Sequence, residues 1–156
     1  MKKRFVAITA AVLGTAASCV WAYLLPSYSY EDMFAKSDLV VIAKPVASRD
    51  TGERKLDRHV NPPVPVASVI TQCDALYVLK GPKLKRFKLH HYRDVSRHDP
   101  NVVVIGAPTG IRFDPSKNAR YLMFLVRDAV GRFAPFAGQT DVELISVQEI
   151  VGTSVD

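Results

Sequence analysis

Residues 68–92 read SVITQCDALYVLKGPKLKRFKLHHY, and this stretch decides the fold. Two runs rich in β-forming residues flank KGPK at residues 80–83, where the glycine and the proline mark a turn. The second run is also strongly basic. The pattern predicts a β-hairpin at the middle of an antiparallel sheet.

Alternation within the two arms predicts which side chains are buried. Every second residue of a strand faces the same side, so Cys73 and Phe87 fall on inward faces, whereas Arg86 and Lys88 fall on an exposed one. The strand RYLMFLVR at residues 120–127 adds further inward positions. The residues that we expect to be buried are Cys73, Ala75, Tyr77, Phe87, Leu89, Leu122, Phe124 and Val126.

The start of the chain has the features of an export signal. MKKR is a positively charged beginning, and residues 5–20 carry no charge and many small side chains. VWA at residues 20–22 offers the small residues that a signal peptidase reads, so we expect cleavage after Ala22. The 156 residues then divide into a signal peptide, residues 1–22, and a single domain, residues 23–156, which is exported to the periplasm or the extracellular space.

A competing cleavage site lies three residues upstream. AASC at residues 16–19 is similar to a lipoprotein signal, in which the thiol of Cys19 is acylated. The leucine preferred at the first position of such a signal is missing. The alternative to a free exported protein is therefore a lipoprotein anchored to the membrane at Cys19.

Removal of the signal lowers the charge of the protein. Lys2, Lys3 and Arg4 leave with it and no acidic residue does, so the formal net charge falls from +6 to +3. This modest charge argues against nucleic acid as the partner. Cys73 is the one cysteine within residues 23–156, so we expect no disulfide in the mature chain and a domain held by its apolar core.

The rest of the chain adds one small helix and several short strands. Ser29 is placed to cap a helix that ends near Lys36, since its hydroxyl can accept a hydrogen bond from the N–H of Asp32. Residues 38–47 form the first strand, and the charged, proline-rich residues 48–65 form a connection too polar to pack. Further strands are expected at residues 102–105, 111–113, 120–127 and 132–136, while residues 142–151 are ambiguous between strand and helix, with helix favoured in the second half.

Five or more short antiparallel strands with a single helix indicate a mainly β protein. Strongly apolar strands need an arrangement without open edges. We therefore predict a small antiparallel β-barrel of OB-like type with one short N-terminal helix.

Four segments carry the most distinctive patterns: SYEDMFAKSDLVVIAKPV (29–46), ALYVLKGPKLKRFKLHHYR (75–93), FDPSKNARYLMFLVR (113–127) and GRFAPFAGQTDVELISV (131–147). In this order they resemble a family of exported bacterial proteins without assigned function, and the likeness covers most of residues 28–147. SDLVVI and YVLKG also resemble, more distantly, the barrel of the tissue inhibitors of metalloproteinases and of netrin modules.

The second resemblance implies a fold but not an activity. The inhibitors act through a mature N-terminal cysteine whose amine and carbonyl bind the zinc of a protease. Here the expected mature N-terminus is Tyr23, and a lipoprotein route would block the amine of Cys19. The disulfide network of the inhibitors is absent as well, so inhibition does not carry over.

No pattern in the sequence assembles a reaction centre. The potential metal ligands are His90, His91, Asp94, His98 and Asp99. Adjacent histidines on a strand point to opposite faces and no zinc-binding spacing is present, so we expect solvated histidines at a strand end and no metal. Cys73 lies mid-strand, where a thiol is typically inert, and no serine has a nucleophile-elbow pattern. We predict that the protein is not an enzyme and needs no cofactor.

A basic stripe on the second arm is the candidate binding face. The candidate ligand-binding residues are Lys85, Arg86, Lys88, His90, Tyr92 and Arg93. Cations on one exposed surface, not neutralised by acids, suit an anionic glycan or a lipid surface, although exposed cations also serve solubility and protect a strand edge. The sequence predicts an exported, non-enzymatic β-barrel module of the cell envelope that binds such a partner or another protein. The alternative is a structural or assembly accessory that acts by protein–protein contact.

Overall fold

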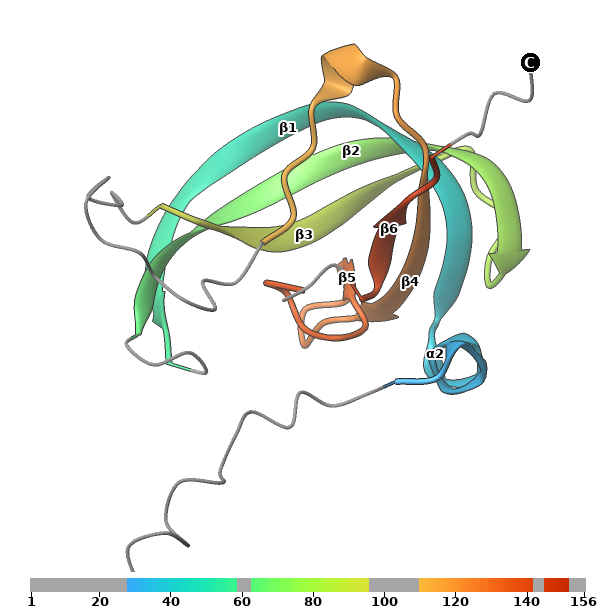
Figure 1. The fold of residues 1–156 in the computed structure, drawn as a ribbon, viewed down its shortest axis with the longest axis horizontal. Helices are drawn as coiled ribbons and strands as arrows, with labels where there is room; N and C mark the ends of the chain where they lie inside the picture. Colours follow the sequence, from blue (N-terminus) through green and yellow to red (C-terminus); the bar gives the residue numbers. More distant parts are fainter. Residues whose placement is uncertain (1–27, 59–62, 96–109, 142–144, 152–156) are drawn as a thin grey trace, which may run out of the picture.

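The computed structural model in Figure 1 describes residues 28–58, 63–95, 110–141 and 145–151. Its elements are α2 (Tyr30–Lys36), β1 (Leu39–Asp57), β2 (Val64–Lys80), β3 (Arg86–Asp94), η2 (Pro115–Lys117), β4 (Tyr121–Arg127), β5 (Phe133–Pro135) and β6 (Val147–Glu149). Three predicted features lie outside the described residues: the signal peptide at residues 1–22, the alternative anchor at Cys19 and the strand at residues 102–105.

The strands join into a ring. β1 pairs with β2 along one edge and with β4 along the other, and β2 pairs with β3, all antiparallel. β3 lies parallel to β5, and β5 pairs antiparallel with β4, which completes the ring. β6 adds a short antiparallel strand beside β4 (Figure 1). The prediction of a mainly β protein with one short N-terminal helix is confirmed.

The predicted central hairpin is present, and its first strand has a longer partner than expected. β2 and β3 pair antiparallel from Val66 with Asp94 to Asp74 with Arg86. Residues 48–57, predicted as part of a loop, instead continue β1 along β2. The prediction of a loop was wrong because β2 supplies hydrogen-bond partners for this backbone, while most of its charged side chains remain at the solvent and Asp57 alone among them is buried.

The main core lies between the strands of the ring. Its buried members are Leu39, Val41, Ala43, Cys73, Phe87, Leu89, Ile111, Met123, Leu125, Phe133 and Val147. Cys73, Phe87 and Leu89 are therefore buried as predicted, and Arg86 and Lys88 are exposed as predicted. Burial alternates as predicted over residues 71–74 of β2 and 86–89 of β3, whereas residues 66–69 and 89–92 are buried on both faces.

The expected burial of Tyr77 is wrong, because Tyr77 is 64% exposed. The register between β1 and β2 shifts beside it, and the extra residue on β2 is Leu76. Such a bulge reverses the alternation, so that Val78 rather than Tyr77 packs against the core. Three other members of the expected buried set are half-buried: Ala75, Leu122 and Val126.

α2 packs on the outside of the sheet. Ser29 caps it as predicted, since its hydroxyl accepts a hydrogen bond from the N–H of Asp32 at 3.0 Å. Met33 is buried in a second, smaller cluster with Phe124, which is also buried as predicted. Phe34, on the same helix, is 44% exposed. Within the described ranges, no helix has the length and apolar character needed to cross a membrane.

The end of the described chain is a strand where the sequence favours a helix. β6 pairs with β4 through Val147 and Met123. The buried carboxylate of Asp141 accepts hydrogen bonds from the N–H groups of Ser146 and Val147, both at 2.9 Å. These hydrogen bonds hold the backbone at the start of β6 in an extended conformation. The residues of β6 alone do not indicate this, because the acceptor, Asp141, lies several residues upstream.

Candidate binding face

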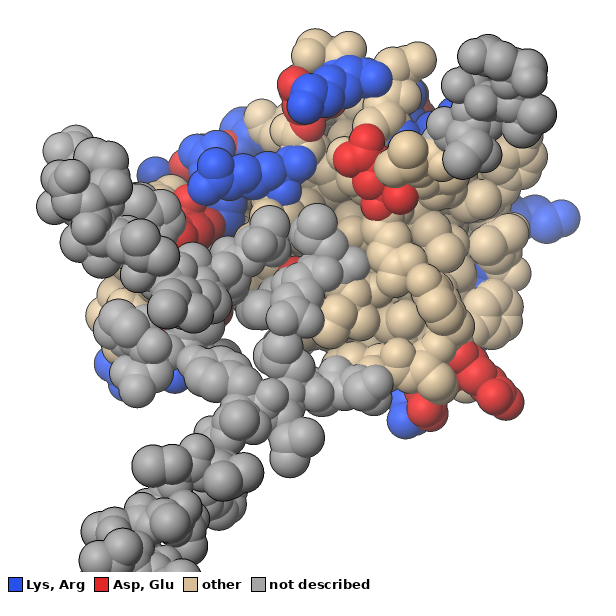
Figure 2. Space-filling view, in the orientation of Figure 1, with Lys and Arg blue, Asp and Glu red and all other residues tan. Residues whose placement is uncertain are grey.

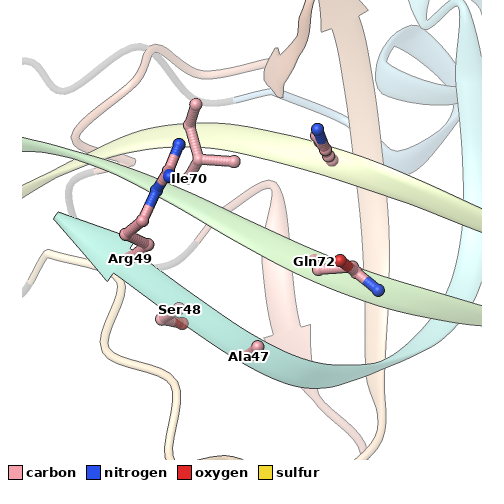
Figure 3. A pocket seen from close by; sticks show the side chains of 6 residues that line it. Ala47, Ser48, Arg49, Ile70 and Gln72 are labelled. Atoms are coloured by element: carbon pink, nitrogen blue, oxygen red, sulfur yellow. The ribbon is translucent and has the colours of Figure 1, made fainter. Parts of the chain in front are cut away.

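The outer side of β1, β2 and β3 carries a shallow hollow of about 310 Å³ (Figure 3). Its lining residues are Ala47, Ser48, Arg49, Ile70, Gln72 and Lys88. Ala47 pairs with Gln72 and Gln72 pairs with Lys88, so one row of side chains crosses three adjacent strands. Figure 2 shows cations and acids interleaved over the part of the molecule where β1 and β2 lie.

Arg49 and Lys88 are the cations of this hollow, and both are exposed. Within the described part of the chain, neither forms an ion pair with an acidic side chain. Arg49 pairs with Ile70, and Figure 3 shows its side chain extending from β1 beside Ile70 on β2. Ile70 and Gln72 are half-buried. The hollow therefore combines two positive charges with an amide and an aliphatic surface.

Two of the predicted site cations are held by acids. Arg86 Nε lies 2.6 Å from Asp74 Oδ1, and Arg93 Nη2 lies 3.0 Å from Asp50 Oδ2. The pKa of Asp50 falls to about 2, chiefly because Arg54 hydrogen bonds to its carboxylate. The expectation that Arg86 and Arg93 lie away from neutralising acids is wrong, because Asp74 comes from the adjacent strand β2 and Asp50 from β1, one strand further, and the sequence does not show the register of either.

The other two predicted cations keep an exposed position. Lys88 lines the hollow, whereas Lys85 lies in the turn before β3, where its carbonyl accepts a hydrogen bond from the N–H of Ala75 at 2.9 Å. Lys85 forms no ion pair with any residue that the structure describes. The predicted stripe is thus divided between the hollow and the hairpin turn.

His90 and Tyr92 are buried, not exposed as the binding-face prediction requires. They are 1% and 4% exposed, respectively. Gln139 covers them: its carbonyl accepts from the N–H of Tyr92 at 2.7 Å, and its side-chain amide lies 2.9 Å from His90 Nδ1. Burial lowers the pKa of His90, and the nearby Arg132 lowers it further. The prediction of solvated histidines was wrong because the covering segment comes from the distant end of the chain.

Ser68, His90 and Asp128 lie in the order of a hydrolytic triad, although their environment does not suit one. Ser68 Oγ is 2.9 Å from His90 Nε2, and His90 Nδ1 is 3.4 Å from Asp128 Oδ2. Nδ1 also lies 2.9 Å from the side-chain amide nitrogen of Gln139, so Gln139 and Asp128 both contact the same ring nitrogen. Ser68 is fully buried, so its hydroxyl is not accessible to a substrate. The geometry fits a buried hydrogen-bond network.

His91 points to the opposite side of β3, as the alternation predicts, and it is also buried. Its Nε2 lies 2.9 Å from Thr71 Oγ1, which lies 2.8 Å from Ser48 Oγ. Burial lowers the pKa of His91 to about 4, so the ring is neutral at physiological pH. A second hollow, of about 490 Å³, lies beside it and is bordered by Arg93 and Arg112.

Among the described residues, no three His, Cys, Asp or Glu side chains meet as metal ligands. His98 and Asp99, two of the potential ligands, lie outside the described residues. Burial, with a smaller contribution from Asp74, raises the pKa of Cys73 to about 12, so its thiol stays protonated.

Sequence reasoning missed Arg49 and Gln72 as members of the hollow, and Asp128 and Gln139 as the partners of His90. Arg49 fell in the predicted loop, although its pairing with Ile70 is consistent with strand alternation. No local signal could have found Asp128 or Gln139, because each contact joins distant parts of the chain. Comparisons with protein families, with curated proteins and with solved structures gave no match for this chain.

Proposed function

We propose that the protein is an exported, non-enzymatic binding module of the cell envelope, built on a small closed β-barrel of OB type. The pairing order β1-β2-β3-β5-β4, with β4 returning to β1 and β3 parallel to β5, supports this fold. The positively charged start and the apolar stretch of residues 1–22 support export.

The partner that we propose is an anionic glycan, and the observation that carries this proposal is the hollow between Arg49 and Lys88. Two cations without acidic partners among the described residues attract carboxylate or sulfate groups. The amide of Gln72 can hydrogen bond to hydroxyls, and Ile70 offers an apolar surface to the face of a sugar ring. Open strand faces of OB barrels commonly bind extended polymers of this kind.

The absence of catalysis in this proposal rests on the buried network around His90. Ser68 has a histidine neighbour, but it is fully buried, so a substrate cannot reach its hydroxyl. The high pKa of Cys73 leaves its thiol unreactive.

A structural or assembly accessory that acts by protein–protein contact is the second candidate. Tyr77 and Leu79 favour it, because both are more than half exposed at the end of β2. Apolar side chains at such a position bind a partner without any requirement for charge, so binding of this kind would be insensitive to salt.

The experiment is a binding titration of the purified protein with heparin as the anionic probe and dextran as the neutral one. We expect heparin binding at low salt that weakens as salt is added, and no binding of dextran. The double variant Arg49→Gln, Lys88→Gln should bind heparin about tenfold more weakly, since each exposed charge contact is worth at most about 1 kcal/mol.

The matched control is the double variant Lys117→Gln, Arg120→Gln, which removes the same charge at and after η2. It should bind heparin within about twofold of the native protein. Equal losses in the two double variants would mean that net charge and not the hollow binds heparin. Absence of heparin binding at low salt would overturn the proposal and leave the protein-contact accessory.

A further inference from the structure

The tip of the β2–β3 hairpin, residues 76–85, exposes apolar side chains next to cations. Tyr77 is 64% exposed, Leu79 is 51% exposed and Leu76 is 41% exposed. Residues 75–93 contain no aspartate or glutamate. The tip therefore combines exposed apolar side chains with positive charge, and such a combination indicates an interaction surface.

The tip is held firmly in place. Val78 and Leu84 pack against the main core from its two arms. The ammonium of Lys80 lies 2.8 Å from the carbonyl oxygen of Phe34 and 2.7 Å from that of Ala35, at the C-terminal end of α2. These contacts tie the hairpin to the helix, and both lie at the right-hand side of Figure 1.

Two bulges on β2, at Leu76 and at Leu79, determine which side chains this tip presents. Val78, between them, packs against the core, and Tyr77 and Leu79 are left exposed. The exposed side chains thus occupy fixed positions on a packed hairpin, so binding through them does not require the hairpin to become ordered.

The charge at the tip is complementary to an anionic surface. Lys83 and Lys85 are exposed and form no ion pair with a described residue. The next cation, Arg86, is already held by Asp74. The two hollows described above are lined by other residues, so the tip is separate from the candidate binding face.

We propose that the hairpin tip docks on the surface of an anionic lipid bilayer. Tyr77 and Leu79 enter the boundary between headgroups and acyl chains, where amphipathic and aliphatic side chains are favoured. Lys83 and Lys85 contact headgroup phosphates. A flat, fluid surface needs no complementary shape, which is why this chemistry fits a lipid surface better than a folded partner. Docking here goes beyond glycan binding, since it uses different residues.

The test is co-sedimentation of the exported protein, without residues 1–22, with vesicles of phosphatidylcholine alone or with roughly one third phosphatidylglycerol. We expect adsorption to the anionic vesicles only. Tyr77→Ser with Leu79→Ser, and separately Lys83→Gln with Lys85→Gln, should each weaken adsorption by about tenfold or more. In a Tyr77→Trp variant, the added tryptophan should shift its emission to the blue on vesicle binding, which reports entry into the boundary.

Matched controls change equally exposed residues elsewhere. Leu56→Ser with Val130→Ser removes apolar side chains that are 55% and 71% exposed, and should leave adsorption within about twofold. The Arg49→Gln, Lys88→Gln variant should still bind vesicles, so that failure of docking and failure of glycan binding are distinguished. Docking would be overturned if the native protein did not bind vesicles but did self-associate, and the Tyr77→Ser, Leu79→Ser variant lost that self-association. This result would favour a protein interface at the tip.

Discussion

Replacement of Gly81 by alanine tests whether the hairpin turn is pressed against the start of β1. Gly81 has a φ of +99°, which side chains of L-residues rarely adopt. A Cβ built there collides with the carbonyl oxygen of Asp38 and lies 3.2 Å from Cα of Leu39. Both neighbours are backbone atoms, so the collision can be relieved only by moving a strand.

The loss of stability has two contributions: the net cost of a positive φ for alanine, and the collision of the Cβ with the backbone. Positive φ costs an alanine about 1–2 kcal/mol, and the lower entropy of the unfolded alanine chain returns about 0.4–1 kcal/mol. The backbone collision adds about 1–3 kcal/mol, as for overpacking of a close-packed site. Gly131 has a φ of +81° with no atom within 4 Å of its Cβ position, so Gly131→Ala carries the first contribution alone. We expect Gly81→Ala to cost about 2–4 kcal/mol and Gly131→Ala about 1 kcal/mol or less.

Urea denaturation followed by far-UV circular dichroism measures both variants against the native protein. The midpoint should fall further for Gly81→Ala than for Gly131→Ala, with the slope of the transition unchanged. Equal losses in the two variants would refute the reasoning, because they would show that backbone strain acts at Gly81 without any contact to Asp38.

Two other predictions concern the core and the buried histidines. Leu125→Ala should lower the free energy of unfolding by about 2–5 kcal/mol, because Leu125 is fully buried. Leu122 is half-buried, so Leu122→Ala should lower it by less than about 2 kcal/mol. Similar losses for the two variants in urea denaturation would contradict the burial that we describe. The pKa of His91 is lower in the folded protein than in the unfolded chain, so protonation of His91 destabilises the fold. The free energy of unfolding should therefore fall by up to about 3 kcal/mol as the pH drops from the unfolded pKa of 6.5 toward 4. His90, whose pKa is also lowered, should make this pH dependence steeper. Urea titrations across this range should show a shallower slope for His91→Gln, and an unchanged slope would contradict the assignment.

Local signals predicted the parts of the fold that depend on neighbours in sequence. The cap at Ser29 needs only Asp32, and the burial of Cys73, Phe87 and Leu89 needs only the unbroken pairing of two adjacent strands around them. Both were confirmed. The ring also agrees with the expectation that strongly apolar strands avoid open edges.

What the sequence could not predict depends on contacts between distant segments. The bulge at Leu76 exists because β1 and β2 differ in path, so nothing around Tyr77 indicates that it faces the solvent. The charged residues 48–57 become a strand because β2 is long enough to pair with them. His90 is buried by Gln139, and no spacing rule links a strand to a segment so far along the chain.

The parallel contact between β3 and β5 has a consequence for how the protein opens. In the described residues this contact rests on one register pair, Leu89 with Phe133, whereas β1 and β2 share a ladder from Val40 to Asp57. Local opening is cheapest where the fewest contacts break, and a ring that opens at one place becomes a curled sheet with its other pairings intact. Backbone amides that hydrogen bond across the β3–β5 contact should therefore exchange their hydrogens through local opening, while those in the middle of β2 wait for global unfolding.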